Sequence, residues 1–256
     1  MKLSEESRIP TNLRTLLILE ILGRSDSAMT PTQINAELGL PKQTVHRLCT
    51  TLEAEGFLIR ETDGKRLRPS RRLRLIASGL LHASRFHITR HQILLDIARE
   101  VNETVNMVIP EETGMNYIDR VEADWPFRIQ LPIGSNVPFH CTASGKTFMA
   151  SMPKGKREQF VAGLKLEQLT DKTHITPESL LEDLKQCRKR GYAIDQEEFM
   201  KDMVAISVPV TDSHGRFVAA LAFHGPIQRL SLEDLEGRKH FLLKGAEALK
   251  HALFDT

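Results

Sequence analysis

The stretch that decides the fold runs from residue 30 to residue 74, TPTQINAELGLPKQTVHRLCTTLEAEG followed by FLIRETDGKRLRPSRRLR. Gly39 allows a tight corner after a first short helix, and Pro41 stands where a second helix begins, a position at which its missing N–H costs nothing. Apolar side chains then recur at helical spacing, at Val45, Leu48, Cys49 and Leu52. This spacing predicts a helix-turn-helix.

The face of the second helix opposite the apolar stripe is polar. Its side chains are Lys42, Gln43, Thr44, His46, Arg47 and Thr50. They gather in the first turns, which is the end that a recognition helix inserts into the major groove of DNA. Two short strands, 57–59 and 65–67, then flank Asp63-Gly64, a dipeptide that favours a hairpin turn. Together these elements predict a winged helix-turn-helix that binds double-stranded DNA.

The charge distribution supports this interpretation. The chain of 256 residues has a net charge of only +2, but residues 1–85 hold 14 Lys and Arg against 9 Asp and Glu. Seven basic residues lie between Arg60 and Arg74, against two acidic ones. Such a density suits DNA phosphates, although a charged run taken alone is as often an ordinary solvated surface. Its position next to the helix-turn-helix favours DNA.

Composition places the chain among folded proteins of two domains. It is 41% hydrophobic and 27% charged, and a chain of 256 residues commonly folds into two domains, each with its own core. No apolar run is long enough for a membrane helix and the polar start MKLSEESRIP is unlike a signal peptide, so we expect a cytoplasmic protein without membrane contact. The three cysteines, Cys49, Cys141 and Cys187, lie far apart and predict neither a disulfide framework nor a cysteine zinc site.

The rest of the pattern predicts a helical connection and a mixed C-terminal part. A helix at 12–24 with Asn12 as its N-cap precedes the helix-turn-helix, whose own first helix starts at Thr30 in a capping box with Gln33. Helical spacing at 73–84 and 88–101 links the two domains. Beyond it we expect strands at 104–109, 116–121, 127–131, 192–194, 205–210 and 217–223, and helices at 142–150, 154–164, 177–190 and 233–254.

The chain resembles the IclR family of bacterial transcriptional regulators over almost its full length. Five motifs in order carry the resemblance: PKQTVHRLCTTLEAEGF, RLRPSRRLRLIASG, PFHCTASGKTFMA, RGYAIDQEE and VAISVPVTDSHGRFVAALAFHGP. The resemblance implies an α+β fold with three parts. These are a winged helix-turn-helix at 1–72, a helical linker at 73–86, and an effector-binding and oligomerisation domain at 87–256 with a GAF- or profilin-like antiparallel sheet flanked by helices.

The resemblance also implies a mechanism and DNA contacts. A homodimer or tetramer binds a palindromic operator, with half-sites about one helical turn or a multiple apart, and transcription changes when a small organic or aromatic acid binds the C-terminal domain. By analogy Gln43, Thr44, His46 and Arg47 contact the groove and phosphates, with Thr50 at the margin, while Lys65, Arg66 and Arg68 bind phosphate. Arg47 is either bidentate to a guanine, bound to a phosphate, or held in a packing ion pair.

The family's effector pocket maps onto Gly134, Ser135, Asp195, Ala205, Ala222 and His224. The N–H groups around Gly134 and Ser135 are expected to hold a carboxylate. The last three positions differ from the polar residues, often Ser or Cys, of better-known members, which favours a larger or more apolar ligand than a small keto acid. His224 either contacts the ligand or is structural, Arg128 either supplies a counter-charge or points to solvent, and Asp202 replaces a frequent glycine.

An enzyme would need a nucleophile and a base, and two pairs of residues are candidates for these roles. These are Cys141 with His140, and Ser144 with Lys146. Neighbours on an extended strand point to opposite faces, and the segment around Lys146 lacks the frame of a phosphate-binding loop. We therefore expect no catalytic activity and no cofactor.

A metal site would need a cluster of ligands, and the sequence offers only part of one. His87 and His91 have the helical spacing of two metal ligands but lack a third, so no metal is expected. A non-DNA protein-interaction module with a metal or small-molecule site remains open. Steep salt dependence of duplex binding distinguishes a DNA-binding protein from such a module.

Overall fold

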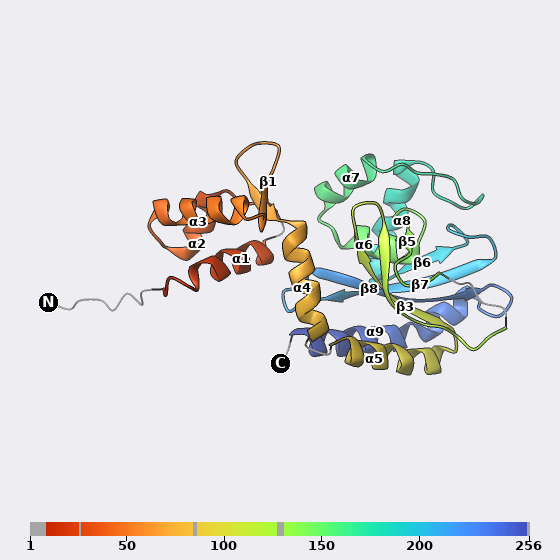
Figure 1. Ribbon diagram of the computed structural model, residues 1–256. Coiled ribbons are helices and arrows are strands. Elements are labelled where there is room, and N and C mark those ends of the chain that lie inside the picture. Colours follow the sequence, from red (N-terminus) through yellow and green to blue (C-terminus); the bar gives the residue numbers. More distant parts are fainter. Residues whose placement is uncertain (1–8, 26, 84–85, 127–130, 255–256) are drawn as a thin grey trace. The chain divides into compact units, whose positions relative to one another are not determined.

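The computed structural model describes residues 9–25, 27–83, 86–126 and 131–254 of the chain (Figure 1). The chain divides into two compact units, Met1–Ser84 and Arg85–Thr256. The division falls between helices α4 (Arg71–Ala83) and α5 (Phe86–Val101), within the segment expected to be helical. None of the described helices is both long and apolar enough to span a lipid bilayer.

The N-terminal unit is a helix-turn-helix with a short hairpin. Its elements before α4 are α1 Arg14–Arg24, α2 Pro31–Leu38, α3 Lys42–Ala54, β1 Leu58–Arg60 and β2 Leu67–Pro69. One side chain from each element before α4 is fully buried in one core: Ile18, Ile34, Val45, Leu58 and Leu67. Each such side chain stabilises the fold by about 1.5–3 kcal/mol relative to an exposed one. The apolar stripe of α3 thereby fixes which face of that helix is left to solvent.

The turn between α2 and α3 has the predicted chemistry. The Thr30 side chain accepts the Gln33 N–H (3.2 Å) and the Gln33 side chain accepts the Thr30 N–H (2.8 Å), which confirms the capping box. Gly39 ends α2 with φ +65°, in the left-handed region that favours glycine. The sequence thus determines both ends of α2, and with them the direction in which α3 leaves the turn.

Two local predictions in this unit were wrong. The N-cap of α1 is Leu13 and no side chain caps that helix, so Asn12 does not cap it. The second strand of the hairpin begins at Leu67, two residues later than expected. The Asp63 carboxylate accepts the N–H groups of Lys65 and Arg66 (2.9 and 3.0 Å) and holds both residues in the turn.

The C-terminal unit is built on one antiparallel sheet. After α5 its elements are β3 Thr104–Pro110, β4 Met115–Val121, β5 Asn136–Val137, α6 Ala143–Ser151, α7 Lys154–Ala162, α8 Pro177–Arg190, β6 Ala193–Gln196, β7 Met203–Thr211, β8 Phe217–Pro226 and α9 Leu232–Phe254. The strand order is β5-β4-β3-β8-β7-β6. This architecture confirms the α+β class with a helix-flanked antiparallel sheet. The expected strand at 127–131 lies almost wholly outside the described residues, and the two-residue strand β5 is too short to give a periodic signal.

Helices cover both faces of the sheet (Figure 1). Leu221 and Phe223 of β8 pack in a core with α5 and α9, whereas Ala220, pointing the other way, packs in a second core with α6, α7 and α8. We call the sheet face toward α6, α7 and α8 the α6 face. A polar side chain in the middle of that face is enclosed on all sides, and it requires a hydrogen-bond partner there.

Candidate DNA interface and effector site

The polar face of α3 is turned to solvent. Val45, Cys49 and Leu52 are buried on the opposite side. Of the predicted contacts on this helix, Lys42, Gln43, His46, Arg47 and Thr50 are exposed and Thr44 is half-buried. The Thr50 hydroxyl donates to the carbonyl of His46 (3.0 Å), so its hydrogen is used within the helix. The remaining exposed side chains can reach an external partner.

A groove of about 350 Å³ lies beside this face. Its lining residues are Thr30, Pro31, Thr32, His46, Cys49, Thr50, Arg60, Gly64 and Lys65. The structure therefore brings His46, Thr50 and Lys65 together at one concave surface. The start of α2 was not predicted as a contact, although its capping box marks a helix N-terminus, whose partial positive charge suits phosphate.

Three arginines of the hairpin are paired with carboxylates. The pairs are Arg60 with Glu53, Arg66 with Asp63, and Arg68 with Glu61. Backbone N–H groups of Lys65 and Arg66 hold the pKa of the Asp63 carboxyl well below its usual range, so it stays charged at neutral pH. The predicted phosphate contacts Arg66 and Arg68 therefore carry less net charge than the sequence run suggests.

Three cations, two on α3 and one in the hairpin, have no carboxylate partner among the described residues. Over the ranges that the structure describes, no carboxylate lies within ion-pair distance of Lys42, Arg47 or Lys65. An uncompensated charge attracts phosphate more strongly than one already paired. These three residues are the strongest candidates for contacts to DNA.

Four of the predicted effector contacts lie on the α6 face. The register places Asp195 of β6 opposite Ala205 of β7, and Ala205 opposite His224 of β8, with Ala222 two residues away on the same strand. All four side chains are buried. Burial and the nearby charge of Glu198 raise the pKa of Asp195 to about 8, so this carboxyl holds its proton at neutral pH and can donate a hydrogen bond.

The expected anion site at Gly134 and Ser135 is not free to bind a ligand. Gly134, with φ +89°, donates its N–H to the carbonyl of Tyr117 (2.9 Å), and Ser135 donates to that of Pro132 (3.0 Å). The Gly134 N–H holds the loop against β4 and the Ser135 N–H closes a turn within the loop, so neither donor is open to the predicted carboxylate in this structure. Backbone donors cannot be assigned to a ligand before the loop's own hydrogen bonds are known.

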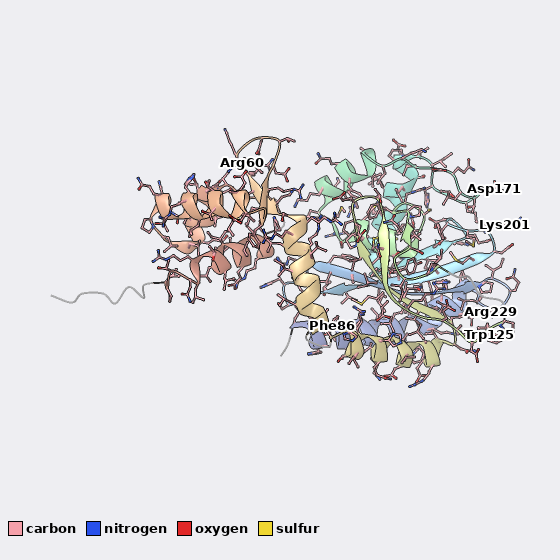
Figure 2. The ribbon with its side chains drawn as sticks, in the orientation of Figure 1. Arg60, Phe86, Trp125, Asp171, Lys201 and Arg229 are labelled. Carbon is pink, nitrogen blue, oxygen red and sulfur yellow. The ribbon has the colours of Figure 1, made fainter. Side chains whose placement is uncertain are left out.

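Arg128 lies outside the described residues, but the chain before it is firmly held. The indole of Trp125 donates to the carbonyl of Asn102 (2.9 Å), and the Arg229 guanidinium lies 4.9 Å from the Trp125 ring centre (Figure 2). Arg229 also pairs with buried Glu103 (2.6 Å).

Several polar residues of the α6 face were missed by sequence reasoning. Asn106 of β3, Arg120 of β4 and Ser207 of β7 are buried there beside the predicted positions. Arg120 donates to the Asn106 side chain (3.2 Å), whose amide donates to Nδ1 of His224 (3.0 Å). The available signal was an isolated polar residue inside an apolar strand, as in TVNMVI and VAISVPV.

A buried ion cluster lies under α6. Lys146 is 1% exposed, and its ammonium group lies 2.7 Å from Asp183 of α8 and also binds Glu198 after β6. His174 approaches both carboxylates at 3.7 and 3.8 Å. Together with His174 these carboxylates form the one grouping among the described residues with metal-ligand spacing. Because the ammonium already lies between the carboxylates, the cluster is an ion-pair network.

The residues weighed for catalysis have structural contacts. His140 Nε2 lies 2.9 Å from the carbonyl of Glu167. Burial raises the pKa of the Cys141 thiol well above its ordinary value, which keeps it protonated and unreactive. At Gly145 a β-carbon would lie 2.2 Å from the carbonyl oxygen of Phe139, so glycine is required for close packing. Of the histidine pair weighed for metal, His91 binds Asp119 (2.9 Å).

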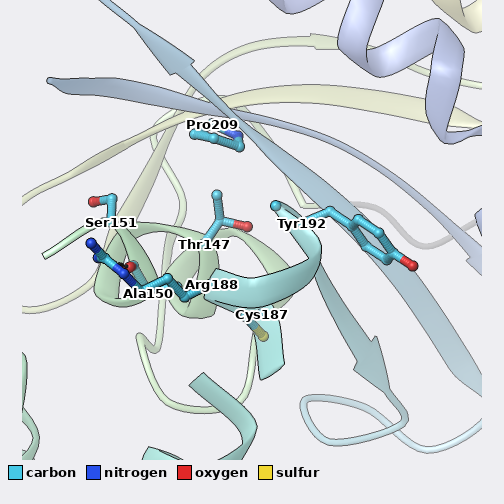
Figure 3. A pocket seen from close by; sticks show the side chains of 8 residues that line it. Thr147, Ala150, Ser151, Cys187, Arg188, Tyr192 and Pro209 are labelled. Carbon is cyan, nitrogen blue, oxygen red and sulfur yellow. Dashed lines mark hydrogen bonds between the residues drawn. The ribbon is translucent and has the colours of Figure 1, made fainter. Parts of the chain in front are cut away.

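A further cavity of about 310 Å³ opens between α6, α8 and β7 (Figure 3). Thr147, Cys187, Tyr192 and Pro209 are among its lining residues. The Arg188 side chain at its edge donates to the carbonyls of Ala150 and Met152 (both 3.1 Å), at the C-terminal end of α6. None of the predicted site residues lies in this cavity.

The N-terminal unit, with its exposed α3 and the groove beside it, is a winged-helix domain of the kind that binds DNA. The C-terminal unit is a second domain, whose helix-flanked sheet carries the candidate effector site. Residues 13–61 match the IclR helix-turn-helix domain, and residues 80–251 match the bacterial transcriptional regulator IclR C-terminal domain. The chain therefore belongs to the IclR family of bacterial transcriptional regulators. It is a DNA-binding regulator with a C-terminal effector domain.

Known proteins resemble the chain over most of its length. The probable transcriptional regulator SauR of Cupriavidus necator is 35% identical over 225 residues, 88% of this chain and 89% of its own. The crystal structure of Thermotoga maritima IclR is 27% identical, with a TM-score of 0.63 over 95% of this chain and 98% of that one. An IclR homologue of Microbacterium hydrocarbonoxydans complexed with 4-hydroxybenzoate is 23% identical, with a TM-score of 0.60 over 94% and 98%. The relatives are regulators and not enzymes.

Proposed function

We propose that this protein binds a palindromic operator as a homodimer or tetramer, and that a small organic or aromatic acid in its C-terminal unit changes operator affinity. The observation that carries the DNA part is the groove where α3, the start of α2 and the hairpin converge. The protein acts in the cytoplasm, where bacterial DNA lies. Gln43, Thr44, His46 and Arg47 face base edges and phosphates.

Exposed apolar side chains in the N-terminal unit support the homo-oligomer. The side chains of Leu13, the N-cap of α1, of Leu16 in α1, and of Leu75, Ile76 and Leu80 in α4 are 42–66% exposed. Surfaces with so many exposed large apolar groups commonly mark protein interfaces. A second copy that covers them forms a twofold dimer, and a twofold dimer presents two α3 helices to the two halves of a palindrome.

The α6 face supports the effector part. Asp195, Ala205, Ala222 and His224 come together there in an enclosed, mixed polar and apolar setting, which is typical of small-molecule sites. The complex of the M. hydrocarbonoxydans homologue with 4-hydroxybenzoate supports an aromatic acid as the first compound to test.

Duplex binding at graded salt concentration tests the DNA part. Duplexes are selected on the purified protein from a random-sequence library, and their affinity is measured by gel shift between low and moderate salt. The logarithm of the association constant should fall linearly with that of salt concentration, with a slope of about −0.9 per phosphate neutralised. Lys42→Ala and Lys65→Ala should each reduce the slope by about one.

Lys154→Ala is the matched control, because Lys154 is an exposed lysine of the C-terminal unit. Its slope should equal that of the parent. A protein that selects no duplex, or whose duplex binding is independent of salt, is an interaction module and not a DNA-binding regulator.

A further inference from the structure

Two arginines of the C-terminal unit lack a carboxylate partner among the residues that the structure describes. Residues 86–256 hold 21 Lys and Arg against 24 Asp and Glu, so carboxylates are available in excess. Every other described arginine of this unit lies at most 3.9 Å from a carboxylate oxygen. The two exceptions are Arg157 of α7 and Arg188 of α8, whose positive charges are therefore uncompensated.

These two arginines meet at the C-terminal end of α6. The Nη1 group of Arg157 lies 3.5 Å from the carbonyl oxygen of Ala150 and 3.2 Å from that of Met152. The Nη1 group of Arg188 lies 3.1 Å from each of the same two oxygens. Because the two guanidinium groups share both acceptors, they are close enough for one polyatomic anion to contact both.

The carbonyl groups do not satisfy the arginine pair. The end of a helix carries only about half a negative charge, which cannot neutralise two guanidinium groups. Arg157 is 8% exposed, and no described group lies within hydrogen-bonding distance of its buried Nε. A buried cation is ordinarily paired with a counter-charge, because leaving it unpaired in a low dielectric is costly. The acceptor for the remaining donors therefore comes from outside the chain.

The cavity between α6, α8 and β7 adjoins the arginine pair. Arg188 and Ala150 are among its lining residues, and Figure 3 shows the Arg188 side chain beside Ala150 at one edge. Cys187 and Pro209 also line it, and burial raises the pKa of the Cys187 thiol to about 11, so the sulfur adds no negative charge. Its volume is about 310 Å³. An apolar cavity of about 150 Å³ already holds a benzene ring, so a small organic group fits here.

We propose that Arg157 and Arg188 bind the phosphate group of a small phosphate monoester, whose apolar part lies in the adjoining cavity. Two guanidinium groups at one point require two negative charges in one compact group. A phosphate monoester carries about −1.5 to −2 at pH 7, whereas a carboxylate carries a single charge, and the planar N–H fork of arginine suits phosphate oxygens. The site is separate from the proposed effector site, since none of the predicted effector residues lines this cavity.

Calorimetric titration in phosphate-free buffer tests the class of ligand with three compounds: phenyl phosphate, inorganic phosphate and phenyl sulfate. The parent protein should bind phenyl phosphate about tenfold more tightly than either of the others. Inorganic phosphate lacks the ring that the cavity receives, and phenyl sulfate carries only one negative charge. The affinity for phenyl phosphate should also rise from pH 5 to pH 7, because the second pKa of the phosphate group is about 6 and arginine stays charged throughout.

Side-chain replacements test the location of the site. Arg188 is exposed, so Arg188→Gln should fold like the parent, and it should weaken phenyl phosphate binding about tenfold and remove the preference over phenyl sulfate. Lys189→Gln is the matched control, because it removes the same charge from the next exposed residue of α8. That variant should bind as the parent does. Arg157→Gln should have the effect of Arg188→Gln, and circular dichroism checks that each variant is folded.

Three results would overturn the proposal. The first is a parent protein that does not bind phenyl phosphate, and the second is equal affinity for phenyl phosphate and phenyl sulfate. The third is equal affinity of Arg188→Gln and Lys189→Gln for phenyl phosphate, which would mean that general surface charge or another site holds the compound. None of these results bears on duplex binding by the N-terminal unit, so the proposed function is tested independently.

Discussion

Asp195 shows how strongly position changes the chemistry of one residue. Burial and the charge of Glu198 raise its pKa to about 8, against the opposing effects of Lys146 and of two backbone N–H groups. In the unfolded chain the same carboxyl titrates near pH 4. Between these values the folded state binds more protons than the unfolded state, so the contribution of Asp195 to stability falls as pH rises from about 4 to about 8.

Replacing Asp195 with asparagine should remove that fall. Asparagine keeps an oxygen that accepts the N–H groups of Glu198 and Phe199, but it cannot lose a proton. We expect the melting temperature of Asp195→Asn, relative to the parent, to increase by several degrees between pH 5 and pH 8. Asp96→Asn, at an exposed position, is the control. Parallel melting curves for Asp195→Asn and parent across this range would contradict the assignment.

Among the residues of α3 that face base edges, Arg47 is the one from which we expect the sharpest sequence discrimination. It is exposed on α3 and has no carboxylate partner among the described side chains. Arg47→Ala should relax the preference for one base at one operator position, by about 1–3 kcal/mol. Affinities for duplexes with each base at every position measure this directly. An equal loss for all duplexes would identify Arg47 as a phosphate contact.

Among the elements, α6 is held to α8 and to the segment after β6 by one ammonium group. Lys146 binds both Asp183 and Glu198 in a buried setting, and the two carboxylates raise its pKa although burial alone lowers it. Removing the cation leaves the buried carboxylate of Glu198 close to the half-buried carboxylate of Asp183, which costs far more than the loss of an exposed pair. The cluster therefore fixes α6 on the sheet, and its loss should lower the stability of the whole C-terminal unit.

Lys146→Met should lower the free energy of unfolding by about 3–5 kcal/mol. Lys154→Met is the control, because Lys154 lies 3.9 Å from Glu158 on the surface of α7 and such pairs contribute below about 1 kcal/mol. Denaturant unfolding of both variants gives the comparison. Similar losses in the two variants would show that the buried cluster does not hold α6.

For the whole molecule, the proposed function requires that effector and operator affect each other's binding. Linkage makes the effect reciprocal, typically about 1–3 kcal/mol or a 5- to 150-fold change in affinity. Once a ligand is found, its affinity should differ by such a factor in the presence and absence of operator duplex. Titrations with a scrambled duplex serve as the control. Equal affinities in all three conditions would leave the C-terminal unit without a regulatory role.

Local patterns predicted some elements well and others poorly. The capping box at Thr30 and the buried stripe of α3 were predictable, because they depend on residues within a few positions of one another. The start of β2 was missed, since side-chain capture of two N–H groups by Asp63 shortens the strand. The hydrogen bonds of the loop at Gly134 were not predictable for a related reason: one donor binds a distant strand and the other closes the loop itself.

The sequence by itself determined the helix-turn-helix and the helices and strands of the C-terminal unit, because periodicity and capping depend on residues within one segment. Its motifs also determined the family and the basic side chains of the N-terminal unit. Tertiary structure alone decided which polar residues share the α6 face. Ser207, Asn106 and Arg120 are far apart in the chain and become neighbours only through the strand order β4-β3-β8-β7. No local pattern encodes that order, since it depends on the simultaneous burial of both sheet faces by α5, α9 and α6 to α8.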